Sequence, residues 1–207
     1  YSMFLDYFGQ THTFQTFDDK VRNKKLIKQL HGTIEEHFDE LAELNSKGAG
    51  VYFTVNKTDL CGRSKKNITD VRAVFIDLDG TPLPTKFDVI PNIVVNTSRN
   101  KFHCYWIVKD MPLESFELYQ EALSNRFNSD TKVKDLSRVM RVAGFYHHKR
   151  NPYPVKIIQC TAHEPYTMKE IRDGLRLVRP ERKVVKYDPS MYQGQYTGTL
   201  RYGCGEG

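Results

Sequence analysis

Two aspartates lie two positions apart at the end of an apolar run, in the segment VFIDLDGTPLP at residues 74–84. In a β-strand, residues i and i+2 point to the same face, so the carboxylates of Asp77 and Asp79 would project together. Two like charges this close need a partner. Either they hold one or two divalent cations, or Asp77 is a nucleophile and Asp79 its acid/base. The first arrangement is typical of nucleotidyl transfer and the second of a phosphatase, and the segment alone is compatible with both.

Basic residues gather in four short segments close to the predicted strands. The chain carries 31 Lys and Arg against 25 Asp and Glu, a formal net charge of +6, and its pI is about 9.0. This balance favours polyanionic partners. The segments are GRSKKN (62–67), NTSRNK (96–101), SRVMRV (137–142) and HHKR (147–150). We expect the following side chains to contact nucleic acid: Arg63, Lys65, Lys66, Arg99, Lys149 and Arg150.

Hydrophobic periodicity predicts the elements that must position these residues. A capping box of Thr33 and Glu36 begins a helix that lasts until Gly48, and a weaker helical pattern covers residues 18–30. The two strands at 91–97 and 101–108 are separated by only three residues, which predicts an antiparallel hairpin. Runs of β-branched and aromatic residues predict the whole set of strands at 50–56, 71–79, 91–97, 101–108 and 154–160.

Further helices are predicted after this group of strands. Pro112 opens an amphipathic segment with apolar residues every three or four positions up to Phe127. Residues 135–142 have the pattern of a short helix that begins at Asp135, and a second capping box at Thr167 begins a closing helix. This order predicts an α+β or split α/β fold with antiparallel pairing, because helices and strands do not alternate strictly.

Size and composition indicate a globular chain of 207 residues, which is enough for one domain or two small subdomains. No stretch approaches the eighteen or so apolar residues of a membrane span and no signal peptide is visible, so we expect a cytoplasmic protein without a membrane partner. The four cysteines form no CxxC pair and are expected to be reduced thiols. The glycine-rich residues 191–207 and the missing initiator Met predict a flexible tail or linker in a longer polypeptide.

Four segments, in this order and spacing, resemble the archaeo-eukaryotic primases, and within them the RepB-like primase-polymerase domains of phages and plasmids. The resemblance implies an RRM-like antiparallel sheet in a catalytic part at about 71–180, packed with an N-terminal α/β subdomain at about 1–70, with the active site between them. It also implies a DNA primase and DNA polymerase that uses two Mg²⁺ or Mn²⁺ ions. The segments are GVYFTVN (50–56), NITDVRAVFIDLDG (67–80), TSRNKFHCYWIV (97–108) and DLSRVMRVAGFYHHK (135–149).

Matching the motifs residue by residue assigns an expected role to each position. Asp77 and Asp79 match the paired acids that bind the catalytic metals, and His103 matches the histidine that contacts the phosphates of the incoming nucleotide. Asp135 matches the third carboxylate of the metal site, with Asp130 as a rival for that role. The catalytic set is therefore Asp77, Asp79, His103 and Asp135, and the nucleotide-binding set is Ser98, Asn100, Lys101, His103, Arg138 and Arg141.

The expected reaction is attack of a 3′-hydroxyl on the α-phosphate of a nucleoside triphosphate, directed by a single-stranded DNA template. In relatives, such a domain often precedes a helicase, so a helicase domain is an expected partner in the parent chain, although none of these residues indicates one. On a shared helix face, Arg138 and Arg141 would form a guanidinium clamp on phosphate.

Several alternatives remain open from the sequence. DLDGT and IVVNTS also fit two motifs of haloacid-dehalogenase phosphatases, but the later acidic pair of that family is missing. A catalytically silent single-strand-binding module would keep the basic residues without needing the aspartates. Asp135 could be only an N-cap paired with Arg138. Tyr105 and Trp106 are more typical of a strand core than of base stacking, and His147 and His148 with a distant cysteine could form a zinc site.

Overall fold

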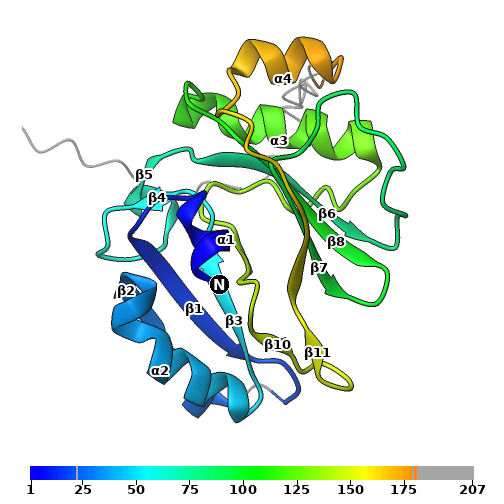
Figure 1. Ribbon diagram of the computed structural model, residues 1–207. Coiled ribbons are helices and arrows are strands. Elements are labelled where there is room, and N and C mark those ends of the chain that lie inside the picture. Colours follow the sequence, from blue (N-terminus) through cyan, green and yellow to red (C-terminus); the bar gives the residue numbers. More distant parts are fainter. Residues whose placement is uncertain (22, 179, 181–207) are drawn as a thin grey trace, which may run out of the picture.

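The computed structural model describes residues 1–21, 23–178 and 180, so the predicted tail at 191–207 lies outside the described residues. Two four-stranded sheets form the body of the molecule, and every ladder in them is antiparallel (Figure 1). We call β2-β1-β3-β9 the first sheet and β12-β7-β8-β6 the second sheet. This arrangement confirms the predicted α+β class with antiparallel pairing.

The second sheet contains the paired aspartates. Its strands are β6 (Ala73–Asp79), β7 (Ile93–Ser98), β8 (Lys101–Ile107) and β12 (Lys156–Cys160). β7 and β8 form the predicted hairpin, and its tight turn holds Asn100 in the left-handed region at φ 59°. Ile76 and Leu78 alternate with the aspartates in β6 and are buried on the opposite face, while Asp77 is only partly buried and Asp79 is exposed.

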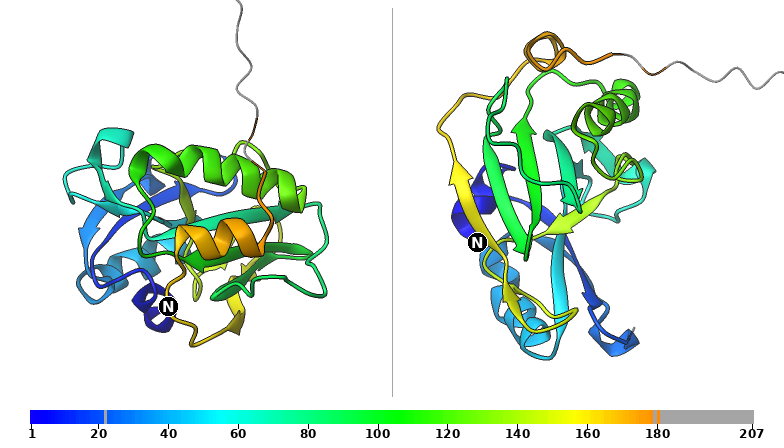
Figure 2. Two further views of the ribbon diagram at one scale, coloured as in Figure 1. Left: turned by 90° about the horizontal axis from the view of Figure 1, so that it is seen from above. Right: turned by 90° about the vertical axis from the view of Figure 1, so that its right-hand side faces the viewer.

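Two helices, α3 (Leu113–Phe127) and α4 (Met168–Gly174), lie over one face of the second sheet (Figure 2). Gln120 of α3 is fully buried and bonds to both backbone groups of Phe75 in β6, at 2.9 Å each. Its amide also donates to the carbonyl of Val133 at 3.0 Å. A buried polar group that is fully bonded specifies one arrangement, so this contact fixes β6 against the helix and the following loop.

The first sheet is built mainly from the N-terminal part of the chain. Its strands are β1 (His12–Asp18), β2 (Gln29–Gly32), β3 (Ala49–Thr54) and β9 (Val139–Arg141). Helix α2 (Ile34–Ser46) packs beside β1 and β3, and begins with the predicted capping box of Thr33 and Glu36.

The short helix α1 (Ser2–Asp6) and the residues after it join the two sheets. The ring of Phe4 lies 5.3 Å from that of Phe53 in β3 and 5.9 Å from that of Tyr105 in β8. Phe8 contacts the same two rings at 4.9 and 5.3 Å. These aromatic side chains are buried, so one continuous core connects the sheets and holds their facing edges in place.

The remaining elements are short and lie in the connections. A small hairpin of β4 (Lys57–Thr58) and β5 (Ile68–Asp70) encloses the 3₁₀ turn η2 (Lys65–Asn67). A second hairpin pairs β10 (Tyr146–His147) with β11 (Tyr153–Pro154). The 3₁₀ turn η1 (Lys24–Leu26) precedes β2.

The predicted helix over residues 18–30 is wrong. Within the described residues of this stretch the chain turns after β1, passes through η1 and pairs again with β1 as β2. The side chain of Asp18 accepts hydrogen bonds from the backbone of Lys20, Val21 and Asn23, which stabilises a turn instead of a helix.

The predicted short helix over residues 135–142 is also wrong, because Val139–Arg141 is strand β9. β9 pairs with β3, so that Met140 is buried while its neighbours point to the other face. Arg138 and Arg141 therefore do not share a helix face. The period of this segment is two rather than 3.6 because tertiary pairing with β3 decides its conformation.

The buried His12 of β1 should make the stability of the fold sensitive to acid. It is 2% exposed, and burial, assisted by the charge of Arg72, lowers its pKa to about 4. Below pH 6.5 the unfolded chain binds a proton that the folded chain does not, so stability falls as the pH decreases towards 4. We expect this histidine alone to reduce the free energy of unfolding by about 2 kcal/mol between pH 7 and pH 5.

Denaturant unfolding at several pH values would measure this loss, with His12→Gln as the comparison. The variant should show a shallower dependence on pH over the same range. An identical slope in both proteins would contradict the assignment.

Candidate nucleotide-binding site

A pocket of about 220 Å³ lies between the two sheets, at the end of β6 that carries the aspartates. Both sheets contribute to its wall, through β3 and β9 on one side and β6, β7 and β8 on the other. Charged and polar side chains predominate in the lining. The lining residues are Tyr52, Asp77, Asp79, Thr97, Lys101, His103, Val133, Arg138, Val139, Met140, Arg141, His147 and Lys149.

The paired aspartates each face a basic residue across the β6–β8 ladder. Asp77 is opposite His103, with 3.7 Å between Oδ1 and Nε2, and Asp79 is opposite Lys101, with 2.6 Å between Oδ1 and Nζ. Directly paired residues of two strands point to the same face, so the ladder brings two carboxylates and two bases into one pocket.

His103 is held in one orientation by a buried phenol. Its Nδ1 lies 3.1 Å from the hydroxyl of Tyr105, which is fully buried and whose one hydrogen-bond partner among the described residues is this histidine. A buried neutral phenol donates its proton, so Nδ1 accepts and Nε2 carries the hydrogen that points toward the pocket. Burial lowers the pKa of His103 despite the opposing effect of Asp77, and the charges of Arg141 and His147 lower it further. The imidazole is therefore neutral at pH 7.

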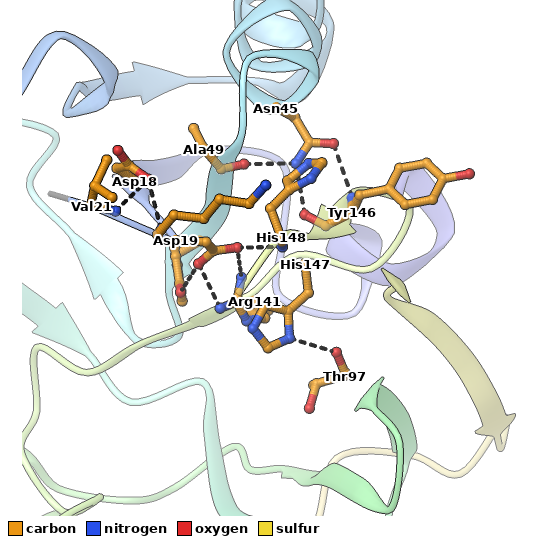
Figure 3. Close-up of polar contacts among 12 residues, drawn as sticks. Asp18, Asp19, Val21, Asn45, Ala49, Thr97, Arg141, Tyr146, His147 and His148 are labelled. Carbon is orange, nitrogen blue, oxygen red and sulfur yellow. Dashed lines mark hydrogen bonds and ion pairs between the residues drawn. The ribbon is translucent and has the colours of Figure 1, made fainter. Parts of the chain in front are cut away.

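Arg141 enters the pocket from β9 and is bound from behind by Asp19 (Figure 3). Its Nη1 and Nη2 donate to the two carboxylate oxygens of Asp19 at 3.0 and 2.8 Å. The guanidinium also lies over the ring of Tyr52, 4.6 Å from its centroid. Burial by itself would raise the pKa of Asp19, but the hydrogen bonds and charge of Arg141 outweigh it, so the pKa is lowered.

His147 reaches the pocket from β10, whose position depends on helix α2. The side chain of Asn45 bonds to the backbone N–H of Tyr146 at 2.9 Å and to its carbonyl at 2.8 Å (Figure 3). The Nδ1 of His147 lies 3.1 Å from the carbonyl of Thr97 at the end of β7. Its Nε2 is buried and has no hydrogen-bond partner among the described residues.

Arg138 also lines the pocket, whereas Asp135 does not. Nη2 of Arg138 lies 2.5 Å from Oδ2 of Asp135, which matches the surface-pair interpretation of this carboxylate. The Nε of Arg138 is buried without a partner in the described part of the chain. The unpartnered buried Nε–H of Arg138 is costly in an unliganded protein, and an anionic ligand in the pocket would satisfy it. The Nδ1 of His147 donates to the Thr97 carbonyl, so the free Nε2 of this neutral imidazole is an acceptor that a donor group of a ligand would satisfy.

The donors of Asp77 and Asp79 fit a divalent cation such as Mg²⁺, which is commonly bound by one or two carboxylates together with substrate phosphates. A third carboxylate is not brought to them: among the described residues, no three His, Cys, Asp or Glu side chains are grouped to hold a metal. The rival Asp130 is exposed, although its backbone N–H bonds to the carbonyl of Asp77 at 3.3 Å. The alternative zinc site of His147, His148 and a distant cysteine is likewise not formed among the described residues.

Other predicted residues lie outside the pocket lining. Ser98 and Asn100 form the β7–β8 turn beside it, and Arg99 of that turn is exposed. Arg63 donates to Gln15 at 2.8 Å, Lys65 pairs with Glu117 at 2.6 Å, and Lys66 and Arg150 are exposed. Tyr105 and Trp106 are fully buried, which confirms the core interpretation over base stacking.

Sequence reasoning missed two residues of the pocket wall and its support, Tyr52 and Asp19. Tyr52 lies in the predicted strand at 50–56, whose pattern alone gives no sign that this ring lines a pocket. Asp19 lies in a segment predicted as a helix and far from every motif. The aromatic and β-branched residues of THTFQTF (11–17) are the signal that would have predicted β1 and its end near Asp19.

Residues 67–183 match the family of the RepB DNA-primase N-terminal domain. The chain belongs to this family. The matched residues contain β6 to β12 and therefore most of the pocket lining. Membership in a primase family favours nucleotidyl transfer over the phosphatase interpretation of the paired aspartates.

A curated protein similar to this chain is a replication protein of Clostridium perfringens, which is 28% identical to it over 175 residues. The alignment covers 74% of this chain and 41% of that protein, so the chain spans about two fifths of the length of this relative.

Solved structures show the same fold. The AEP domain of the primase-polymerase of cyanophage S-2L has a TM-score of 0.66 at 20% identity, over 84% of this chain and 95% of that chain. The catalytic domain of the primase RepB′, in complex with initiator DNA, has a TM-score of 0.59 at 16% identity, over 84% and 88%. The predicted archaeo-eukaryotic primase fold is thus confirmed.

No helix among the described residues is long and apolar enough to span a bilayer.

Proposed function

We propose that this chain catalyses template-directed nucleotidyl transfer, as the primase-polymerase domain of a mobile-element or phage replication protein. One observation carries the proposal. Two carboxylates and six basic residues line one pocket between the two sheets, which has room for the phosphates of a nucleotide. Phosphoryl transfer depends mainly on positioning and on neutralising charge, which is what this set of side chains supplies.

Asp77 and Asp79 would hold Mg²⁺ or Mn²⁺ through their carboxylates. When bound, such ions neutralise phosphate charge and lower the pKa of the attacking hydroxyl. His103 would donate from Nε2 to a phosphate oxygen as a neutral imidazole, while Lys101, Arg138 and Arg141 would supply positive charge. Asp135 or Asp130 would complete the metal site only after a local rearrangement, because neither lines the pocket.

The single-stranded DNA template would run along the basic residues around the pocket. Lys149 lies in the lining and the exposed Arg150 follows it, while the exposed Arg99 lies in the turn between the lining residues Thr97 and Lys101. We assign single-stranded DNA as the template and nucleoside triphosphates as substrates, with Arg63, Lys65 and Lys66 as more distant DNA contacts. A helicase in the parent chain remains a proposed partner.

The test is incubation of the chain with a single-stranded DNA template, labelled nucleoside triphosphates and Mg²⁺ or Mn²⁺, with and without a primer. Labelled products that require template and metal are expected, and products formed without primer would establish priming. Salt-sensitive DNA binding without any product would indicate a silent binding module. Release of phosphate from a small phosphomonoester, without nucleotide products, would indicate the phosphatase.

A further inference from the structure

Asp19 is a buried acid that belongs to none of the sequence motifs, yet four groups around the pocket wall converge on it (Figure 3). Its side chain is only 4% exposed. Besides the two hydrogen bonds from Arg141, it accepts one from the backbone N–H of His148 at 2.8 Å and one from the hydroxyl of Tyr52 at 3.2 Å. A buried carboxylate this fully bonded is a fixed anchor for the groups that bond to it.

The geometry leaves Arg141 available to a second anion. A guanidinium has five N–H groups, and the contact with Asp19 uses one from each Nη. Three N–H groups therefore remain. The ring of Tyr52 and the carboxylate of Asp19 restrict the guanidinium, while its side chain lines the pocket. Holding a rotamer-rich side chain in place before binding removes part of the entropic cost of binding.

Gly50 of β3 provides the room for this pair. A Cβ at this position would lie 2.6 Å from Nη1 of Arg141 and 2.7 Å from Oδ1 of Asp19, which is closer than real Cβ contacts allow. Its backbone is not in the left-handed region, so glycine is needed here for space. The missing side chain at Gly50 thus leaves the space that the Asp19–Arg141 pair occupies.

We infer that Asp19 is a positioning residue that holds Arg141 against the triphosphate of the incoming nucleotide. This inference rests on the proposed function, because it assigns the ligand of Arg141 from the nucleotide-binding pocket. Asp19 acts through Arg141 and does not contact the nucleotide itself. The N-terminal part of the chain, outside the matched family residues, then contributes to nucleotide affinity through Arg141.

The test is equilibrium binding of a non-hydrolysable nucleoside triphosphate in the presence of Mg²⁺, with thermal unfolding of each variant as a check on folding. Asp19→Asn should weaken binding about tenfold, because an amide cannot accept from all of these donors and leaves Arg141 unrestrained. The matched control is Asp18→Asn, which removes a neighbouring carboxylate whose hydrogen bonds, among the described residues, come from the turn backbone. It should bind within about twofold of the wild type.

The dependence on Arg141 is tested in the Arg141→Met background. There, Asp19→Asn should cause no further loss of affinity. A second tenfold loss in this background would overturn the inference, since Asp19 would then act on the fold as a whole. Binding by Asp19→Asn equal to that of Asp18→Asn would also overturn it.

Gly50→Ala provides a second variant that keeps both charged side chains and remains informative if Asp19→Asn does not fold. Its methyl group should displace the pair and weaken binding about fivefold, whereas unchanged binding would overturn the inference. The proposed function has a separate readout. If the wild type binds the analogue but incorporates no nucleotide, the proposed function alone is contradicted. If the wild type incorporates nucleotides and the Asp19→Asn and Gly50→Ala variants bind the analogue as tightly as the wild type, the inference alone is contradicted.

Discussion

Asp77→Asn is expected to reduce nucleotide incorporation by at least about a thousandfold, because it removes a carboxylate on which the proposed metal site depends. Asp77 projects from the end of β6 into the pocket, where its Oδ1 lies 3.7 Å from Nε2 of His103. Asparagine has the same shape but lacks the charge that attracts a divalent cation. The measurement is the rate of labelled nucleotide incorporation at saturating template.

The fold and DNA binding should survive this change. The side chain of Asp77 is 27% exposed, so the free energy of unfolding should change by less than about 1 kcal/mol. Asp70→Asn, at the exposed end of β5, is the matched control and should retain full activity. Equal loss of incorporation and of salt-sensitive DNA binding in Asp77→Asn would contradict a metal-binding role and indicate a structural one.

The same assay applied to Asp130→Asn and Asp135→Asn bears on the third carboxylate. Neither residue lines the pocket, and Asp135 is paired with Arg138. A loss close to that of Asp77→Asn in one of them would identify the carboxylate that joins the site when substrates bind.

His103→Ala is expected to lower kcat/KM for the nucleotide about a hundredfold, the effect of removing one preorganised hydrogen-bond donor from a phosphoryl-transfer site. The donor is preorganised because Tyr105 holds Nδ1 and leaves Nε2–H directed toward the pocket. Tyr105→Phe keeps the ring and the core but releases the imidazole, so it should show a smaller loss. Steady-state kinetics against nucleotide concentration separate the two variants.

The pH dependence tests the charge state of His103. Burial lowers its pKa below the usual 6.5, so the imidazole is already neutral at pH 7 and should stay so up to pH 8. Raising the pH from 7 to 8 should therefore not reduce activity through this group. A decrease over that range in the wild type that is absent from His103→Gln would show that the protonated imidazole is required.

The sequence by itself determined the local elements of the site. The i, i+2 spacing of Asp77 and Asp79, the short turn before Lys101 and the capping boxes at Thr33 and Thr167 all act within a few residues. Such signals are encoded in one segment, and the structure contains the strands and helices that they predict. The position of His103 opposite Asp77, by contrast, depends on the register of β6 and β8, which no single segment encodes.

Tertiary structure decided the elements whose conformation depends on distant partners. Residues 139–141 carry a helical pattern but form β9, because pairing with β3 outweighs a weak local preference. Arg138 and Arg141 reach the pocket even though the helix face proposed for them does not exist.

Asp19 shows the limit of sequence reasoning most clearly. It is 122 positions from Arg141 in the chain, and the two meet because β1 and β9 pair with opposite edges of β3. The sequence around Asp19 does not indicate that its partner is Arg141, and the sequence around Arg141 does not indicate Asp19. Which buried charges compensate each other is settled by sheet order and register, and these depend on packing of the whole core rather than on the periodicity of any one segment.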